Sequence, residues 1–206
     1  MASKESSISI QPGYRPGFLA RCLEMHITYY HPTILWGRVF ETSLARDFGH
    51  LIDRLDSNPR NQVWAAIQST PHADSNNFTQ QIVGTILVDS ESFQGSGTRT
   101  AQIRGFIVDE RARGLGAGKK LLAAAMEFIK DNDFDRATLF TSRGQEASLH
   151  LYKKAGFDIE DEVDKVVWER RLKVLQLGWE RPVLVTRVDD NRHKQEQDLL
   201  REESPI

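Results

Sequence analysis

The chain has 206 residues, of which 39% are hydrophobic and 27% charged, and its formal net charge is −2 at pH 7. These values favour a globular protein with a full core, and they disfavour nucleic-acid binding, which usually requires a strongly basic surface. The single cysteine, Cys22, excludes an internal disulfide and a zinc site built from cysteines, and no metal site is expected.

The two ends of the chain differ in composition from the rest. Residues 1–5 are polar and are expected to be disordered, and the start of the chain lacks the apolar segment of a secretory signal. Residues 189–206 are highly charged, which predicts a frayed helix or a disordered tail. A single domain is therefore expected at residues 6–188. No run of about 18 apolar residues is present, so we expect no membrane partner and a cytoplasmic location.

The first third of the chain predicts one strand and two helices. Alternating Ser and Ile at 6–10 indicate a short strand, and the Pro-Gly pairs that follow indicate a loop. Apolar residues at helical spacing predict a helix at 18–30, which Pro32 should end. Residues 31–39 are interpreted as an irregular connection. A second apolar stripe predicts a helix at 40–55.

The rest of the chain alternates strands with helices. Hydrophobic patterning predicts a strand beginning at 157–159, helices at 118–130 and 145–154, and further strands at 62–68, 81–89, 100–109, 137–141 and 182–188. The segment 160–181 is not assigned from its pattern. The predicted order, β-α-α-β-β-β-α-β-α-β-β, indicates an α/β protein with a mixed sheet and helices on both faces.

The stretch 102–120, QIRGFIVDERARGLGAGKK, runs from an apolar strand through a glycine-rich turn into a helix. Four cations gather around the helix start: Arg111, Arg113, Lys119 and Lys120. A helix N-terminus already carries partial positive charge, so this cluster favours a bound anion such as phosphate. The Walker pattern is absent, which disfavours a phosphate-loop nucleotidase. A dinucleotide site, and a tight turn whose glycines serve only the backbone conformation, are the alternatives.

Two motifs together resemble a known superfamily. Residues 113–118 fit the pattern R-x-x-G-x-G, and further along the chain comes QEASLHLYKKAGF at 145–157. The pair is similar to the GCN5-related N-acetyltransferase (GNAT) superfamily, and most closely to its small-molecule acetyltransferases, over residues 102–157. The resemblance implies the GNAT fold, in which a mixed, mostly antiparallel sheet has helices on both faces and two central parallel strands splay around acetyl-CoA.

The resemblance also implies which residues hold acetyl-CoA as the cofactor. The main chain of Phe106, Ile107 and Val108 would hydrogen-bond the pantetheine arm. The pyrophosphate would lie on the backbone N–H groups of the turn, which belong to Arg113, Gly114, Leu115, Gly116, Ala117, Gly118 and Lys119. Gln145 and Ser148 stand where the family often has Asn and Ala, and both are expected to contact the cofactor. The candidates for the 3′-phosphate are Lys119, Lys120, Arg111 and Arg143.

The catalytic residues follow from the same resemblance. Tyr152 matches the family tyrosine that protonates the departing CoA thiolate, with packing against the sheet as the alternative. The backbone N–H of Val108 corresponds to the family's oxyanion donor. Many family members carry a Glu on the preceding strand, where this chain has Arg104, Gly105 and Phe106. The candidates for the general base therefore lie elsewhere, at Glu41, His26 and His31, each of which also has a structural interpretation. A water relay is a further alternative.

The acceptor site is expected from the first helix, the loop after it and the segment 168–177. Tyr29, Tyr30 and His31 match the family's acceptor wall. Trp168 is expected to line the pocket, with core packing or a dimer contact as the alternative. Because WERRLKVLQL resembles an insertion that closes the acceptor site, it disfavours an open groove for a peptide.

The sequence therefore predicts an N-acetyltransferase that transfers the acetyl group of acetyl-CoA to a primary amine. The expected acceptor is a small molecule, such as an amino acid, a polyamine or an amino metabolite, and the transfer is direct in a ternary complex. Acetylation of a protein or peptide, and a non-catalytic acyl-CoA-binding module, are the alternatives. The resemblance also allows a homodimer.

Overall fold

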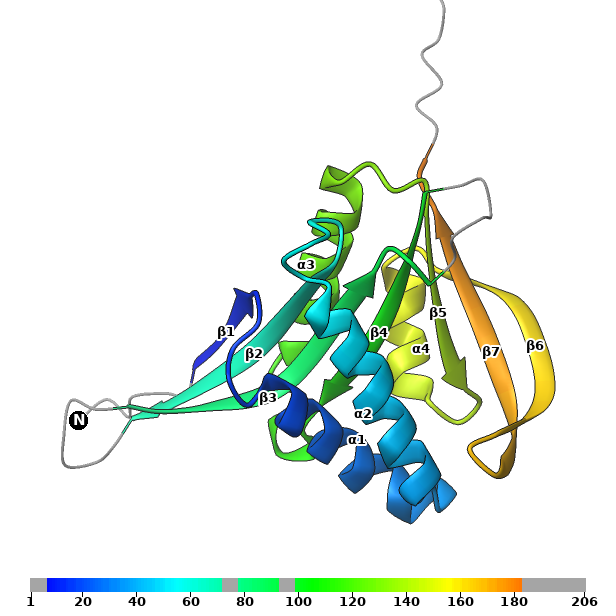
Figure 1. The fold of residues 1–206 in the computed structure, drawn as a ribbon, viewed down its shortest axis with the longest axis horizontal. Coiled ribbons are helices and arrows are strands. Elements are labelled where there is room, and N and C mark those ends of the chain that lie inside the picture. The colour runs from blue at the N-terminus through cyan, green and yellow to red at the C-terminus, as the bar shows by residue number, and fades with distance from the viewer. Residues whose placement is uncertain (1–6, 72–77, 93–98, 183–206) are drawn as a thin grey trace, which may run out of the picture.

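The computed structural model describes residues 7–71, 78–92 and 99–182, which form one sheet covered by helices (Figure 1). Within these residues the sheet has seven strands in the order β1-β2-β3-β4-β5-β7-β6. The strands are β1 (Ser7–Pro12), β2 (Gln62–Pro71), β3 (Phe78–Asp89), β4 (Thr100–Val108), β5 (Arg136–Ser142), β6 (Asp158–Val167) and β7 (Arg170–Glu180). All neighbours are antiparallel except β4 and β5, which are parallel. The predicted mixed, mostly antiparallel sheet is confirmed.

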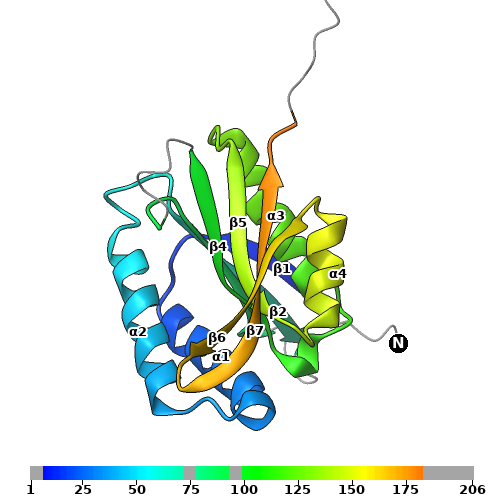
Figure 2. The same cartoon turned by 90° about the vertical axis from the view of Figure 1, so that its right-hand side faces the viewer.

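Two helices cover each face of the sheet (Figure 2). The first pair, α1 (Phe18–Ile34) and α2 (Arg38–Asp53), packs on one face, and α3 (Ala117–Asp131) and α4 (Glu146–Lys154) pack on the other. A short 3-10 turn, η1 (Glu110–Ala112), joins β4 to α3. The order of element types matches the predicted one, but the last strand is β7 and not the predicted 182–188. None of the described helices combines the length and the apolar character that crossing a membrane requires.

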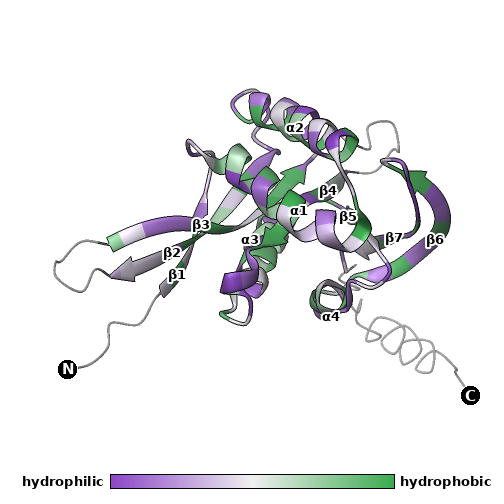
Figure 3. Ribbon diagram, turned by 90° about the horizontal axis from the view of Figure 1, so that it is seen from below, coloured by the Kyte–Doolittle hydropathy of each residue, from purple (hydrophilic) through white to green (hydrophobic). Residues whose placement is uncertain are grey.

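Strand β2 shows why helices are needed on both sides of the sheet. Val63, Ala65 and Ile67 pack with α1 and α2, whereas Trp64 and Ala66 belong to the core under α3. Side chains alternate between the two faces of a strand, so an uninterrupted apolar run must be covered twice. Figure 3 shows polar and apolar residues together along α1 and α2, as this amphipathic packing requires.

Helix α1 continues past Pro32, so the prediction that this proline ends the helix is wrong. The last residue of α1 is Ile34, and the predicted irregular connection shortens accordingly. Proline removes one N–H donor, but the next turn still closes, because the Leu35 N–H donates to the His31 carbonyl. The Thr33 hydroxyl adds a bond to the Tyr29 carbonyl at 3.0 Å. The helix ends where Leu35 turns left-handed at a φ of 59°.

The unassigned segment 160–181 forms most of the β6–β7 hairpin, so the interpretation of 168–177 as an insertion is wrong. Two residues, Trp168 and Glu169, make the turn, with φ values of 45° and 66°. A left-handed pair in a hairpin turn usually contains Gly or Asn. Because this turn has neither, its sequence does not indicate a hairpin. Of the predicted strand 182–188, only Pro182 is described, and it is not in a strand. The predictions for 1–5 and 189–206 also lie outside the described residues.

Strands β4 and β5 separate soon after they meet. They pair only from Thr100 to Gln102 on β4 and from Arg136 to Thr138 on β5. Further along, β4 bulges against β3, because its partner changes from Leu87 opposite Arg104 to Thr85 opposite Ile107. Gly105 lies in this bulge with a φ of +52°. A wedge-shaped gap therefore opens between the two parallel strands.

Replacing Gly105 with alanine should destabilise the fold at this bulge. A Cβ atom on Gly105 would overlap Leu87 Cδ1, and the backbone would keep a left-handed conformation. We expect the free energy of unfolding, measured in urea, to fall by about 2 to 4 kcal/mol.

Gly49→Ala is the matched control for this substitution. Gly49 lies inside α2, and a Cβ atom there would have no neighbour within 4 Å. Alanine should raise the free energy of unfolding there by roughly 0.5 to 1 kcal/mol. If both variants shifted stability equally, the strain assigned to the bulge would be refuted.

Candidate active site

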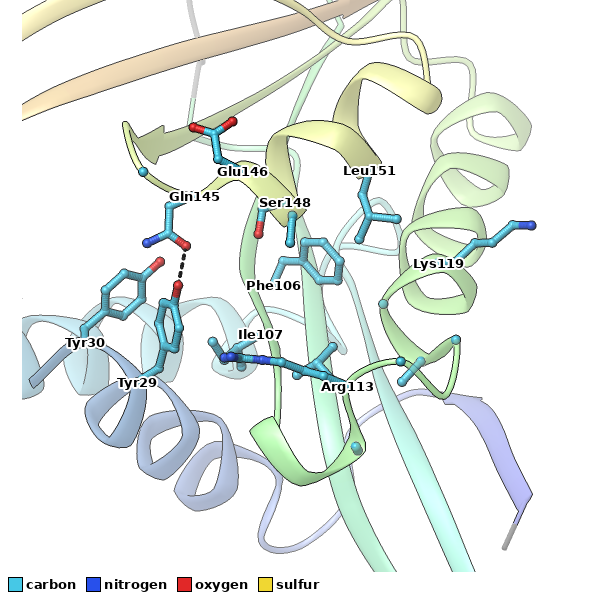
Figure 4. A pocket seen from close by; sticks show the side chains of 18 residues that line it. Tyr29, Tyr30, Phe106, Ile107, Arg113, Lys119, Gln145, Glu146, Ser148 and Leu151 are labelled. Carbon is cyan, nitrogen blue, oxygen red and sulfur yellow. Dashed lines mark hydrogen bonds between the residues drawn. The ribbon is translucent and has the colours of Figure 1, made fainter. Parts of the chain in front are cut away.

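A cavity of about 550 Å³ occupies the gap beside β4 and reaches the first turns of α3 and α4 (Figure 4). The residues predicted to contact the acetyl group, the pantetheine arm or the pyrophosphate gather around it, apart from Leu115 and Tyr152, whereas the 3′-phosphate candidates Lys120, Arg111 and Arg143 do not line it. Those that line the cavity are Phe106, Ile107, Val108, Arg113, Gly114, Gly116, Ala117, Gly118, Lys119, Gln145 and Ser148. The cavity therefore joins the two sequence motifs, which are far apart in the chain. We call it the large cavity.

The glycine-rich turn presents free backbone donors to the large cavity. Gly114 and Gly116 both have a φ of 80°, a conformation that disfavours other residues. Gly116 is also the N-cap of α3, and no side chain caps this helix end. The first N–H groups of a helix have no partner within it, so those of Ala117, Gly118 and Lys119 are available. This turn can hold an anion through backbone bonds and the helix dipole.

The four cations near this turn separate in the fold. The Arg111 guanidinium pairs with Asp109 at 2.8 Å, and the Lys120 ammonium donates to the Ile8 carbonyl at 3.0 Å. The Lys119 side chain points away from the other labelled side chains, so this residue contributes its backbone (Figure 4). Only Arg113 extends across the cavity among these four (Figure 4).

Arg113 takes part in a link that closes the α1 side of the cavity. Its guanidinium lies 4.7 Å from the centre of the Tyr29 ring. The Tyr29 hydroxyl in turn donates to Gln145 Oε1 at 2.9 Å, which connects α1 to the start of α4 (Figure 4). Arg143, another predicted phosphate contact, instead pairs with Glu162 on β6 at 3.1 Å.

Asp109 fixes the end of β4 and is unsuited to act as a base. It pairs with Arg111 and with Arg21 of α1, and it caps η1 by accepting from the Arg111 backbone. The hydrogen bonds from Arg111 and Arg21 lower the pKa of this carboxyl far below its usual range, against the opposing effect of burial. The charge stays on Asp109 at any physiological pH, and it is neutralised by the two arginines.

The backbone of β4 offers donors to the gap. The Asp109 N–H donates to the Val83 carbonyl at 2.8 Å, which places this bond on the β3 side. Backbone groups alternate between the two edges of an antiparallel strand, so the Val108 N–H and carbonyl point away from β3. They face the gap that β5 leaves open. This is the geometry of an edge that can bind an extended ligand.

Two predicted cofactor residues do not line the large cavity. Leu115 is 52% exposed at the tip of the turn. Tyr152, on α4, is 6% exposed and packs on Phe106 with ring centroids 5.8 Å apart. Burial, and then the nearby Tyr30, raise the pKa of the Tyr152 hydroxyl above its usual value. That hydroxyl forms no hydrogen bond with the described residues.

A second cavity, of about 300 Å³, continues along β4 beyond the bulge. Residues 102–105 line this small cavity, whereas 106–108 line the large one. Tyr30 is the one described residue that borders both. The small cavity lies between α1, α2 and the β6–β7 hairpin, and Trp168 lines it as predicted. The two cavities therefore meet beside the bulge, at Gly105 and Phe106.

Two predicted residues lie apart from both cavities. Glu41 is exposed in the first turn of α2, and His31 donates from Nδ1 to the Trp36 carbonyl at 2.8 Å. His26, the third candidate for the base, does line the small cavity. Arg104 of β4 pairs with Asp89 and Asp47 at 3.1 and 3.2 Å.

Sequence reasoning missed most of the small cavity. Its walls include the aromatic residues Trp36, Phe40, Phe48 and Phe140. The apolar stripe of α2 was assigned wholly to the core, and Phe140 was read as part of a buried strand. The one available signal is the number of aromatic residues between 29 and 48, which are Tyr29, Tyr30, Trp36, Phe40 and Phe48.

Comparison with solved structures finds the same fold in several acetyltransferases. A ribosomal-protein-alanine N-acetyltransferase from Brucella melitensis is 18% identical, with 84% of this chain and 99% of that chain covered and a TM-score of 0.61. The NatC complex bound to Gag peptide and CoA contains a chain that is 15% identical, with 85% and 99% covered and a TM-score of 0.63. A Salmonella typhimurium structure with its cofactor acetyl-CoA is 16% identical, with 84% and 94% covered and a TM-score of 0.60.

At these identities, the likeness shows the fold alone. No curated protein sequence matches the chain. The model of the acetyltransferase (GNAT) family, in contrast, matches residues 33–157, which is more than half of the chain and includes β4, α3 and α4 around the large cavity. The chain therefore belongs to the GNAT family of acetyltransferases, and it is an acyltransferase whose acetyl donor is acetyl-CoA.

Proposed function

We propose that this enzyme acetylates the primary amine of a small molecule by direct transfer in a ternary complex. The observation that carries the proposal is the continuity of the two cavities along β4. One cavity follows residues 106–108 and ends at a free helix N-terminus, and the other follows 102–105 and is lined by aromatic rings. A cofactor in the first and an acceptor in the second would bring their reactive ends together at the bulge.

The large cavity has the features that acetyl-CoA requires. The pyrophosphate would lie on the amides of 114–119 at the start of α3, with Arg113 beside it. The pantetheine arm would extend along Phe106, Ile107 and Val108, whose outward backbone groups could pair with its amides like an added strand. Gln145 and Ser148 would contact it from the α4 side, and the acetyl group would arrive near Tyr30.

The reaction would need three contributions from the chain. The amine nitrogen attacks the thioester carbonyl, and the Val108 N–H would stabilise the oxyanion that forms. When the C–S bond breaks, Tyr152 would give its proton to the thiolate. Because Glu41 and His31 lie apart from both cavities, a water relay is the favoured route for removing the amine proton.

The β6–β7 hairpin favours a small acceptor over a peptide. The Trp36 indole N–H donates to the Val167 carbonyl at 3.2 Å, and Trp168 packs edge-on against Trp36 and Phe40 at 4.8 and 4.9 Å. These contacts join the hairpin turn to the α1–α2 connection and cover one end of the small cavity. An extended chain would have to break them in order to pass through.

Two alternatives have specific support. Structures of similar fold include the NatC complex with a peptide and a ribosomal-protein-alanine acetyltransferase, which keeps peptide acetylation as the second candidate. The absence of a carboxylate on β4 supports a non-catalytic acyl-CoA-binding module. A cytoplasmic location and a homodimer stay predictions, which cell fractionation and light scattering would test.

The decisive assay measures thiol release from acetyl-CoA with a panel of small amines and of peptides with free N-termini. We expect turnover with small amines and little with peptides. Turnover with peptides and little with small amines would contradict the proposal and support peptide acetylation. Tight CoA binding by calorimetry without turnover on any acceptor would favour the binding module.

Tyr152→Phe should lower kcat without weakening CoA binding. Loss of a general acid typically costs roughly 10²- to 10⁴-fold in rate, whereas the ring that packs on Phe106 is kept. Since the pKa of this hydroxyl is raised, it stays protonated throughout the usual assay range, and the wild type should show no activity loss from Tyr152 at alkaline pH. Tyr14→Phe, at a half-exposed loop residue, is the control and should match the wild type. A parallel fall in CoA affinity would make Tyr152 a packing residue.

Arg113→Ala should weaken CoA binding by about tenfold, because it removes the one nearby guanidinium that extends across the large cavity and also frees the Tyr29 ring. Calorimetry at low and high salt would measure the dissociation constant, and the salt dependence should shrink in the variant. Arg46→Ala, at an exposed residue of α2, is the control. Equal affinities for the two variants would remove Arg113 from the proposed site.

A further inference from the structure

His26 is a buried imidazole that opens onto the small cavity. It lies on α1, one turn before Tyr30, and is 7% exposed. Nδ1 is 2.8 Å from the Cys22 carbonyl, and because a carbonyl can only accept, Nδ1 carries the proton. The ring stacks against Tyr30 at 6.1 Å and tilts against Phe48 at 5.8 Å, so its orientation is fixed.

The other ring nitrogen, Nε2, therefore holds a free lone pair. It forms no hydrogen bond with any described residue. Among the described side chains, only Arg60 has a polar atom that is both sealed from solvent and unpaired. Nε2 is thus in contact with the cavity that His26 lines. A rigid, buried acceptor without a partner, open to a cavity, is suited to receive an N–H from a ligand.

The groups around His26 keep it uncharged. On its own helix are Cys22 and Tyr30, and burial raises the pKa of each to about 12, so both stay neutral. Among the other lining residues, Asp47 of α2 is paired with Arg104 of β4, and Lys165 of β6 lies over the Phe140 ring at 5.5 Å. Thr85 of β3 meets the Cys22 sulfur.

No unpaired carboxylate among the described residues thus faces the imidazole. Burial lowers the pKa of His26 to about 4, against the opposing bond to Cys22. The ring is therefore neutral at every pH well above 4, and it would repel neither an uncharged amine nor a carbonyl, but it could not hold a proton taken from an ammonium group.

The rest of the small cavity favours a ring-sized apolar body. Seven of its lining residues carry aromatic rings, among them Trp36, Phe40, Phe140 and Trp168. Its volume of about 300 Å³ is at the lower end of the range for small-molecule sites. Besides His26, the polar residues that line the small cavity are Asp47, Gln102, Arg104, Thr141, Ser142 and Lys165. Asp47 and Arg104 pair with each other and Lys165 lies over the Phe140 ring, so a polyol or a chain of ammonium groups would gain few free polar partners for the water it loses.

We propose that His26 Nε2 accepts a hydrogen bond from the acceptor amine, and that the enzyme takes ring-bearing primary amines in their uncharged form. This inference rests on the proposed acetyl transfer. The uncharged amine nitrogen forms the C–N bond as the C–S bond breaks. Nitrogen then loses one proton and the thiolate sulfur gains one, so the step is balanced without an external acid or base. His26 orients the lone pair of the nitrogen and does not titrate.

The contact can be measured without turnover. In ¹⁵N spectra of the histidine rings, assigned with the His26→Phe variant, His26 should keep the Nδ1–H tautomer down to a pH of about 4. Adding benzylamine to the CoA-bound protein should shift the Nε2 resonance and leave Nδ1 nearly unchanged. An unchanged Nε2 resonance at saturating benzylamine would overturn the contact. A ring that protonates near neutral pH would do the same.

Kinetics then test the class of acceptor. For aniline, benzylamine and phenethylamine, kcat/KM should rise with pH up to the pKa of each amine. When kcat/KM is calculated with the concentration of the uncharged amine alone, it should be independent of pH. Putrescine and glucosamine should be poor acceptors. A break at one common pH for all amines would show a titrating enzyme base and refute the inference, and a preference for putrescine would refute the proposed class.

Variants separate His26 from general packing. His26→Phe keeps the ring contacts but removes Nε2, and it should lower kcat/KM for amines by about ten- to a hundredfold with unchanged CoA affinity. His26→Gln should recover part of the loss, because its amide oxygen can accept the same N–H. His150→Phe, at an exposed residue of α4, is the matched control.

The variants and the spectra also separate this inference from the proposed function. Equal activity of His26→Phe and the wild type would contradict the inference alone. Absence of thiol release with every amine would contradict the proposed function, while the ¹⁵N shift would still decide whether His26 contacts an amine.

Discussion

The active site depends on the parting of two parallel strands. Strands β4 and β5 share three paired positions and then diverge, which leaves backbone donors and acceptors of β4 without a neighbour. Buried backbone groups of this kind are costly unless something pairs with them. In the proposed function that partner is the cofactor, which would extend the sheet when it binds. The bulge at Gly105 interrupts the pairing of β4 with β3 in the same region.

Around the gap, the positive end of the α3 dipole is left without a partner, whereas the charged side chains of Asp109 and Arg104 are neutralised by ion pairs. Asp109 is held by two arginines and ties the end of β4 to α1, while Arg104 is held between Asp47 and Asp89. The N-terminal end of α3 has no capping side chain, so its first backbone N–H groups and the positive end of its dipole are free to bind an anion. An anion is thus attracted to the turn, whereas the charges of Asp109, Asp47 and Arg104 are paired. This separation suits a cofactor that is charged at one end and neutral at its reactive end.

The sequence predicts the large cavity much better than it predicts the small one. The glycine turn and the α4 motif are local patterns, and most of the residues predicted from them line one cavity; Leu115, Tyr152 and the outer cations Arg111, Lys120 and Arg143 do not. The small cavity is assembled from side chains that each have an ordinary packing explanation, such as Phe40 and Phe48. It also depends on a hairpin whose turn, Trp168-Glu169, lacks the usual turn residues. Long-range contacts decide whether an aromatic residue fills a core or borders a space, and periodicity does not record them.

The hairpin that covers the small cavity has a consequence for how this enzyme can change. The region matched by the family model ends at residue 157, before β6 begins, and it starts after His26 and Tyr30. In the proposed function, most of the donor cavity belongs to this block, with Tyr29 and Tyr30 of α1 added, and part of the acceptor cavity is supplied by segments before and after the block. On this proposal, substitutions in the Trp168 turn would alter the acceptor while the residues that line the large cavity stay unchanged. Selection can thus act on the two halves separately, and new acceptors can be acquired without rebuilding the catalyst.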